Sequence, residues 1–215
     1  LIHEVLEVSD SSDLAELEKL KLSRWNSLEF EAEWLEDLGK RQAARMLANL
    51  AEYLKQFESD GGQVLAKEQN FSFELGNISV RGQVDRIEQL ADGNIVIVDL
   101  KTGKQAATSA DTLVNPQLAL YQMAVLEGGF QDLDSIDPKQ LAGAKLLIVG
   151  GAKFAERKQP AMDADESARF KKLLLDCSEG MSKSVFVAQL SNHCESERSF
   201  GSCSLHLTPA VSYVG

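Results

Sequence analysis

Hydrophobic residues recur every three or four positions between residues 13 and 58, which is the spacing of one face of an α-helix. The pattern is carried by Leu35, Leu38, Met46, Leu47, Leu50, Leu54 and Phe57. Asp60-Gly61-Gly62 predicts the end of this helical part, and Gly39 predicts a break within it. We expect Trp25, Trp34 and Tyr53 in the core or at an interface.

From residue 63 the hydrophobic positions alternate instead, which is typical of β-strands. Gly76-Asn77 and Asp92-Gly93 are turn signals between consecutive strands, so an antiparallel meander is predicted. Asn115-Pro116 combines a favoured cap with a favoured first residue of a helix. The elements predicted after residue 62 are strands at 64–75, 78–87 and 95–101, a helix at 115–127, a strand at 144–149 and a helix at 163–177.

The composition is that of a globular chain: 215 residues, of which 44% are hydrophobic and 26% charged. No apolar run approaches the roughly 20 residues of a membrane-spanning helix, so no membrane partner is expected. Three cysteines are too few for a disulfide scaffold, and the first ten residues lack the basic start of a signal peptide. We therefore expect a reducing, cytoplasmic location. Because the chain starts without Met in an amphipathic run, we expect a segment of a longer protein.

The net charge of −11 differs from the basic patch that is usual in nucleic-acid-binding proteins. Residues 1–62 hold 14 acidic and 7 basic residues, which leaves a net charge of −4 for the other 153. A carboxylate cluster that binds a divalent metal also adds negative formal charge without repelling a phosphate. The charge therefore does not exclude a nucleic-acid substrate.

The predicted strand at 95–101 ends in charged residues. Alternation places Ile97, Asp99 and Lys101 on one face of this strand. Asp85 lies as far before the second turn as Asp99 lies after it, so the two carboxylates are predicted to be near-opposite and within reach of one ion. Such oxygen ligands suit Mg²⁺ or Mn²⁺, and a lysine beside them can neutralise charge in a transition state. The alternative is an exposed ion pair between Asp99 and Lys101, worth under ~1 kcal/mol.

The helix predicted after Asn115 carries two polar side chains four residues apart, Gln117 and Tyr121, which therefore share a face. They lie in its first turns, and this end of a helix favours anions such as phosphate. The alternative is an ordinary amphipathic helix that turns Leu118, Tyr121 and Val125 inward.

Three motifs in this order, GQVDRI, VDLKTG and QLALY, resemble the PD-(D/E)XK nuclease superfamily, and within it the RecB-type nuclease domain of UvrD/Rep-like helicase-nucleases. That family reads G-x-x-D-R, D-x-K-T-G and Q-x-x-x-Y, preceded by a histidine in a helix, which LIHEVLE resembles. The resemblance implies an α/β, restriction-endonuclease-like fold: a mixed sheet core flanked by helices, with a helical N-terminal elaboration. The expected parts are an N-terminal helical part at 1–62, the nuclease core at 63–179 and an irregular tail at 180–215.

The resemblance also implies the roles of individual residues. The catalytic residues would be Asp85, Asp99 and Lys101. The ligands of Mg²⁺, or of Mn²⁺ in its place, would be His3, Asp85, Asp99 and the carbonyl of Leu100. Gln117 and Tyr121 would contact DNA or order the site, and Glu68 resembles an acidic position near the first strand.

The activity implied is that of a metal-dependent DNA exonuclease in double-strand-break repair and recombination. Its partners would be DNA and a helicase motor domain or subunit outside this chain, since no Walker A phosphate loop occurs in the sequence. One alternative is an inactive nuclease-fold module that binds DNA or supports a helicase, against which the retained Asp85, Asp99 and Lys101 argue. Another is a free-standing nuclease resembling those of CRISPR spacer acquisition, against which the long N-terminal helices argue.

Some members of this family hold an iron–sulfur cluster through four cysteines. Here Cys194 and Cys203 are the only candidates in the tail, and Cys177 falls on a predicted helix as a small core residue, so no cluster is expected. His193 and His206, with the two tail cysteines, form a loosely spaced alternative set for zinc. The remaining interpretation is a tail that packs through its apolar residues.

Overall fold

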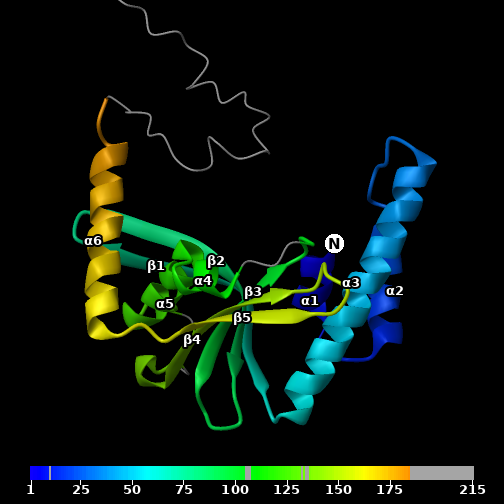
Figure 1. The fold of residues 1–215 in the computed structure, drawn as a ribbon, viewed down its shortest axis with the longest axis horizontal. Helices are drawn as coiled ribbons and strands as arrows, with labels where there is room; N and C mark the ends of the chain where they lie inside the picture. Colours follow the sequence, from blue (N-terminus) through cyan, green and yellow to red (C-terminus); the bar gives the residue numbers. More distant parts are fainter. Residues whose placement is uncertain (10, 105–107, 132, 134–135, 185–215) are drawn as a thin grey trace, which may run out of the picture. The chain divides into compact units, whose positions relative to one another are not determined.

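The computed structural model describes residues 1–9, 11–104, 108–131, 133 and 136–184 (Figure 1). The chain divides into two units, Leu1–Lys172 and Leu173–Gly215, and only residues 173–184 of the second are described. Every candidate residue of the nuclease site, from His3 to Tyr121, lies in the first unit. The expected division at residues 62 and 179 stays a prediction.

The order of helices and strands follows the predicted one, with additions that periodicity did not indicate. In chain order the elements are α1 (Ile2–Val8), α2 (Leu14–Trp25), α3 (Glu33–Ser59), β1 (Gln63–Leu75), β2 (Ile78–Gln89), β3 (Ile95–Lys101), α4 (Ser109–Leu113), α5 (Pro116–Leu126), the 3₁₀ turn η1 (Pro138–Gln140), β4 (Leu141–Ile148), β5 (Ala155–Pro160) and α6 (Ala164–Met181). The additions are α4, η1 and β5. The Asn115 side chain caps α5 as predicted, accepting hydrogen bonds from two backbone amides of its first turn.

The strands form one sheet in the order β1-β2-β3-β4-β5 (Figure 1). The first three are antiparallel neighbours, which confirms the meander, and β4 and β5 are also antiparallel. β3 and β4 are parallel, and the chain between them includes α5. A parallel pair needs such a long crossover connection. The sheet is therefore mixed, and the predicted fold class is confirmed.

Hydrophobic clusters cover both faces of the sheet. On one face, Val98 and Leu100 of β3 pack in a cluster with α1, α2 and α3. On the other face, Ile95 and Ile97 pack in a cluster with α5. The alternation predicted for β3 is thus observed. The central strand is buried on both sides, and its end meets α1 from one side and α5 from the other.

The predicted break at Gly39 is wrong, because α3 runs through this residue and the chain turns earlier, between α2 and α3. A Cβ atom at Gly39 would lie 3.3 Å from the ring of Phe30 and 3.4 Å from the ring of Trp25. The glycine thus lets these two rings, which stack on each other, approach the helix closely. Trp25 and Tyr53 are buried, as expected, whereas Trp34 is 66% exposed. Within the described part of the chain, no helix combines the length and apolarity that crossing a bilayer requires.

Candidate active site

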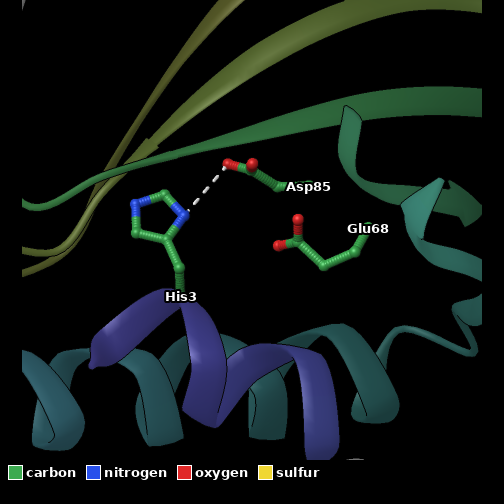
Figure 2. A group of neighbouring side chains, drawn as sticks. All are labelled: His3, Glu68 and Asp85. Carbon is green, nitrogen blue, oxygen red and sulfur yellow. Dashed lines mark ion pairs between the residues drawn. The ribbon is translucent and has the colours of Figure 1, made fainter. Parts of the chain in front are cut away.

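Helix α1 brings His3 to Asp85, which lies within strand β2. Ile2, Val5 and Leu6 anchor this short helix because their side chains are buried in the core. The His3 side chain remains 45% exposed, and its Nδ1 lies 3.6 Å from Oδ2 of Asp85 (Figure 2). The Asp85 carboxylate raises the pKa of the His3 imidazole above its ordinary value, and partial burial opposes this effect.

Asp85 is held against β3 by a hydrogen bond to the backbone. The paired residues of β2 and β3 run from Gln89 and Ile95 to Arg86 and Val98. One residue further, Oδ2 of Asp85 accepts a hydrogen bond from the backbone N–H of Leu100, with a donor–acceptor distance of 2.6 Å. The carboxylate thus lies against the segment of β3 between the other two predicted catalytic residues.

Glu68 joins this group from β1. Its neighbours Lys67 and Gln69 pair with Arg86 and Val84, so Glu68 stands opposite Asp85. The backbone of Glu68 has a φ of 45°, in the left-handed region that costs a non-glycine residue about 1–3 kcal/mol. Burial and then the Asp85 carboxylate raise the pKa of Glu68. A strained backbone thus sits where a second carboxylate approaches the first.

His3, Glu68 and Asp85 converge on one point from three elements, as Figure 2 shows. Each offers one ligand atom, and these atoms all lie within 4.8 Å of one another. Carboxylate oxygens are ligands that Mg²⁺ and Mn²⁺ prefer, and an imidazole can complete such a set. The chemistry of these donors therefore fits a divalent cation.

Asp99 and Lys101 begin a second group at the end of β3. The side chain of Asp99 is only 3% exposed, and its Oδ2 lies 2.8 Å from the ammonium of Lys101, which is 41% exposed. Burial raises the pKa of Asp99, and Lys101 opposes this shift. Despite the short distance, Oδ2 has no partner with hydrogen-bond geometry among the described residues. The Lys101 ammonium is thus the positive charge that compensates this buried carboxylate.

Helix α5 completes the second group with both residues predicted on its first turns. Lys101 donates to Oε1 of Gln117 at 3.0 Å, and Nε2 of Gln117 donates to the Tyr121 hydroxyl at 2.8 Å. The Tyr121 hydroxyl in turn donates to Oδ1 of Asp99 at 3.3 Å. Burial and then the Asp99 carboxylate raise the pKa of Tyr121. The four side chains form a closed ring of contacts that holds the ammonium in place.

The predicted site residues thus form two groups. His3, Glu68 and Asp85 form one, and Asp99 with Lys101, Gln117 and Tyr121 forms the other. Asp99 is not one of the three residues whose ligand atoms lie within 4.8 Å of each other. The hydrogen bond from Leu100 to Asp85 joins the groups.

A buried charged network adjoins the site, and sequence reasoning missed it. Arg86 directly follows Asp85, and its Nε donates to Oε1 of Glu88 at 2.7 Å; both side chains are at most 2% exposed. The Tyr53 hydroxyl donates to Glu88 at 2.6 Å, and Nζ of Lys145 lies 3.1 Å from Oε2 of Glu88. Two opposite charges at alternate positions of one strand, Arg86 and Glu88, were the available signal.

The cysteine predictions fall mostly outside the described residues. His193, Cys194, Cys203 and His206 all lie in residues 185–215, so the predictions on a cluster and on zinc stay predictions. Cys177, in α6, is exposed rather than in the core.

Comparison with known proteins gives the following similarities. A family model described as the PD-(D/E)XK nuclease superfamily matches residues 1–205. Two relatives from Streptococcus pyogenes are named as subunits of an ATP-dependent helicase/deoxyribonuclease: that of serotype M49 (strain NZ131) is 35% identical over 107 residues, and that of serotype M3 (strain ATCC BAA-595 / MGAS315) is 40% identical over 91. The matches cover 47% and 40% of this chain, and 8% of each relative. A solved structure, "Crystal structure of SSO0001", is 15% identical with a TM-score of 0.41, over 88% of this chain and 95% of that one.

Proposed function

Because the chain belongs to the PD-(D/E)XK nuclease superfamily, we propose that it is a metal-dependent DNA exonuclease domain that hydrolyses phosphodiester bonds. The observation that carries this proposal is the meeting of two groups beside the end of β3, where its pairing with β2 stops. One is a set of three metal-ligand side chains, and the other is a carboxylate–lysine pair fixed by an amide and a phenol.

The proposed metal ligands are the three converging side chains and two groups on β3. They are His3, Glu68, Asp85, Asp99 and the carbonyl oxygen of Leu100. A bound Mg²⁺ or Mn²⁺ would polarise the scissile phosphate and lower the pKa of an attacking water. The hydrogen bond from Leu100 orients Asp85, and burial keeps Asp99 poorly solvated. Both effects hold the carboxylates ready without rearrangement when the substrate arrives.

Lys101 supplies the fixed positive charge of the proposed mechanism. Its ammonium lies between Asp99 and Gln117 and remains partly exposed, so it can reach a phosphate oxygen or the attacking water. A donor already aimed at developing charge lowers the barrier without reorganisation in the transition state. Tyr121 is buried and orders Gln117 and Asp99 from behind, whereas Gln117 at the start of α5 can face the DNA backbone.

We further propose that the domain works within a larger helicase-nuclease in double-strand-break repair and recombination, in the cytoplasm. The similarity to relatives named as helicase/deoxyribonuclease subunits supports this proposal, and this chain covers 8% of those relatives. With a net charge of −11, the chain alone neutralises few phosphates. A motor outside the chain would deliver the strand and raise its effective concentration at the site.

Digestion of end-labelled linear DNA and of circular DNA by the purified chain tests the proposal. We expect linear DNA to be degraded with Mg²⁺ and not in EDTA, and circular DNA to be spared. Asp85→Ala and Asp99→Ala should abolish cleavage and weaken metal binding together. Lys101→Ala should lower the rate about 10²–10³-fold with metal binding retained, and Lys55→Ala, an exposed lysine of α3, should change neither.

Three results would contradict the proposal. Cleavage that persists in EDTA would argue against a metal site, and full activity in Lys101→Ala would argue against the role of the lysine. No cleavage at all by the parent chain with metal would favour the inactive DNA-binding module.

A further inference from the structure

A row of polar side chains leads away from the three metal-ligand residues along the β1–β2 hairpin. Because strand side chains alternate, Arg81, Gln83 and Asp85 of β2 point to one face. Their partners on β1 are also polar: Ser72 pairs with Arg81, and Asn70 pairs with Gln83. The row ends where Glu68 stands opposite Asp85. The hairpin therefore carries a continuous polar path to the candidate site.

A groove of about 620 Å³ follows this path. Its polar lining consists of Asn70, Ser72, Arg81, Gln83 and Gln131, together with the glycines at 82 and 129. Among the residues that the structure describes, no aspartate or glutamate lines this groove, although the chain carries 33 of them. Amides, a hydroxyl and a guanidinium all donate hydrogen bonds to anionic oxygens. The described lining of the groove thus offers a phosphate several hydrogen-bond donors and no carboxylate.

The dimensions of the row suit a polynucleotide strand. Side chains on one face of a β-strand repeat about every 6.8 Å, which is close to the spacing of successive phosphates in an extended single strand. Gln83 lies one such repeat from Asp85, and Arg81 lies two. Gln83 is fixed by its hydrogen bond to the Glu68 carbonyl oxygen at 2.9 Å. Arg81 is an exposed residue, and the Nε of its guanidinium donates a hydrogen bond to Oγ of Ser79 at 3.3 Å.

The groove favours contacts to the strand's backbone rather than to its bases. Stacking of bases needs an exposed aromatic face, and the one aromatic residue of the lining, Phe71, is only 4% exposed. Its ring also occupies the space above Gly82, where a Cβ atom would lie 2.5 Å from the ring. Recognition in this groove would therefore not depend on base sequence.

We propose that this groove binds the sugar–phosphate backbone of the DNA strand beside the cleaved bond, with Arg81 on a phosphate about two nucleotides away. This inference rests on the proposed nuclease function. It adds the path that the DNA strand follows on one side of the cleaved bond. Arg81 is a substrate-binding residue in this proposal, and the metal ligands do not depend on it.

The test compares Arg81→Ala with Arg41→Ala, an exposed arginine of α3 that lies outside the groove and carries the same charge. On a single-stranded oligonucleotide, Arg81→Ala should raise KM about tenfold, with a smaller effect on kcat, and Arg41→Ala should leave both unchanged. The slope of log kcat/KM against log salt should fall by about 0.7 in Arg81→Ala, the loss expected for one phosphate contact to a single strand.

A neutral methylphosphonate, placed at each phosphate in turn, locates the contact. In the parent chain, one position about two nucleotides from the cleaved bond should raise KM, and Arg81→Ala should be insensitive to that substitution. Asn70→Asp, which adds a negative charge to the groove, should raise KM as a second, independent variant.

The outcomes separate this inference from the proposed function. If the parent chain does not cleave DNA, the proposed function fails. If the parent cleaves DNA but Arg81→Ala matches Arg41→Ala in KM and in salt slope, only the groove is refuted. Equal methylphosphonate sensitivity in the parent and in Arg81→Ala would refute it too.

Discussion

Replacing Glu88 by glutamine should strongly destabilise the protein, because this carboxylate is the centre of the buried network beside the site. Glu88 is fully buried and takes hydrogen bonds from Tyr53 and Arg86. Lys145 lies beside it at 3.1 Å and has a second carboxylate, Glu156, at 2.7 Å. Glu88→Gln keeps the size of the side chain and removes its charge.

The size of the loss in the free energy of unfolding depends on which partner of Glu88 is left without a negative charge beside it. Lys145 keeps Glu156, so its loss is partial. Arg86 can still donate to the amide oxygen of the glutamine and keeps the ring of Phe57, 5.2 Å from its Cζ, but it loses the carboxylate charge, and its Nη1 already has no hydrogen-bond partner among the described residues. Removing one partner of a buried ion pair costs about 3–5 kcal/mol. For a chain of this size each 1 kcal/mol shifts Tm by about 2–4 °C, so we expect a Tm lower by about 10 °C.

Urea denaturation and thermal melting, each followed by circular dichroism, would measure this loss. Glu52→Gln, a change of an exposed glutamate on α3, is the matched control and should cost less than about 0.5 kcal/mol. Adding Arg86→Met to Glu88→Gln should recover part of the loss, because no unpaired guanidinium then remains buried. A loss below about 1 kcal/mol, or a double variant less stable than the single one, would refute the reasoning.

Three further predictions concern the tyrosine of this network, the metal and the amide of α5. Burial and the Glu88 carboxylate raise the pKa of Tyr53 above its ordinary value of about 10. The free energy of unfolding measured in urea should therefore keep this contribution below about pH 10 and decrease as the pH rises above it. Tyr53→Phe should reduce this decrease, and an unchanged dependence on pH would contradict the prediction. Mg²⁺ at a hundred times its Kd should add about 2.7 kcal/mol of stability, and this gain should vanish in EDTA and in Asp85→Ala; a gain that Asp85→Ala retains would place the cation elsewhere. Gln117→Ala frees the Lys101 ammonium from its 3.0 Å contact and should raise the DNA concentration needed for cleavage while the Mg²⁺ gain remains; loss of that gain would make Gln117 part of the metal site.

Regular periodicity predicted the parts of the site that lie on regular elements. Alternation along β3 placed Asp99 beside Lys101, and their side chains meet at 2.8 Å. Helical spacing placed Gln117 beside Tyr121, and they are hydrogen-bonded at 2.8 Å. Both expectations depend only on local geometry, which the type of secondary structure determines.

The pattern of hydrophobic and polar residues did not predict where the strands depart from regular geometry. The left-handed backbone at Glu68 breaks the alternation of β1, so a count of positions does not predict which face its carboxylate meets. Asp85 and Asp99 follow the last paired residues of β2 and β3 in the near-opposite register that was expected, but the register does not predict that the Asp85 carboxylate accepts a hydrogen bond from the Leu100 amide. Both features lie where regular pairing is interrupted or stops, so the register alone does not fix these side chains.

Two elements were missed for reasons visible in their residues. Strand β5, with the sequence AERKQP, has no apolar alternation, and its buried Gln159 is stabilised by hydrogen bonds to carbonyl oxygens of Thr112 and Asn115 instead. Helix α4 is only five residues long, too short for helical periodicity to appear. Its capping box, formed by Thr108 and Asp111, was a local signal that could have revealed it.

The parallel pairing of β3 with β4 governs when, during synthesis, the site can exist. The last of the candidate nuclease-site residues to emerge from the ribosome is Tyr121. Strand β3 can pair with its second neighbour, β4, only after Leu141–Ile148 has also emerged. The Asn49 side chain of α3 likewise waits for the carbonyl oxygens of Val149 and Gly151, which follow it by 100 and 102 residues. Until then β3 is an edge strand, open to wrong pairing. A nascent chain therefore carries every candidate side chain before β3 has both of its neighbours, and the arrangement of the candidate site is complete only once β4 has paired with β3.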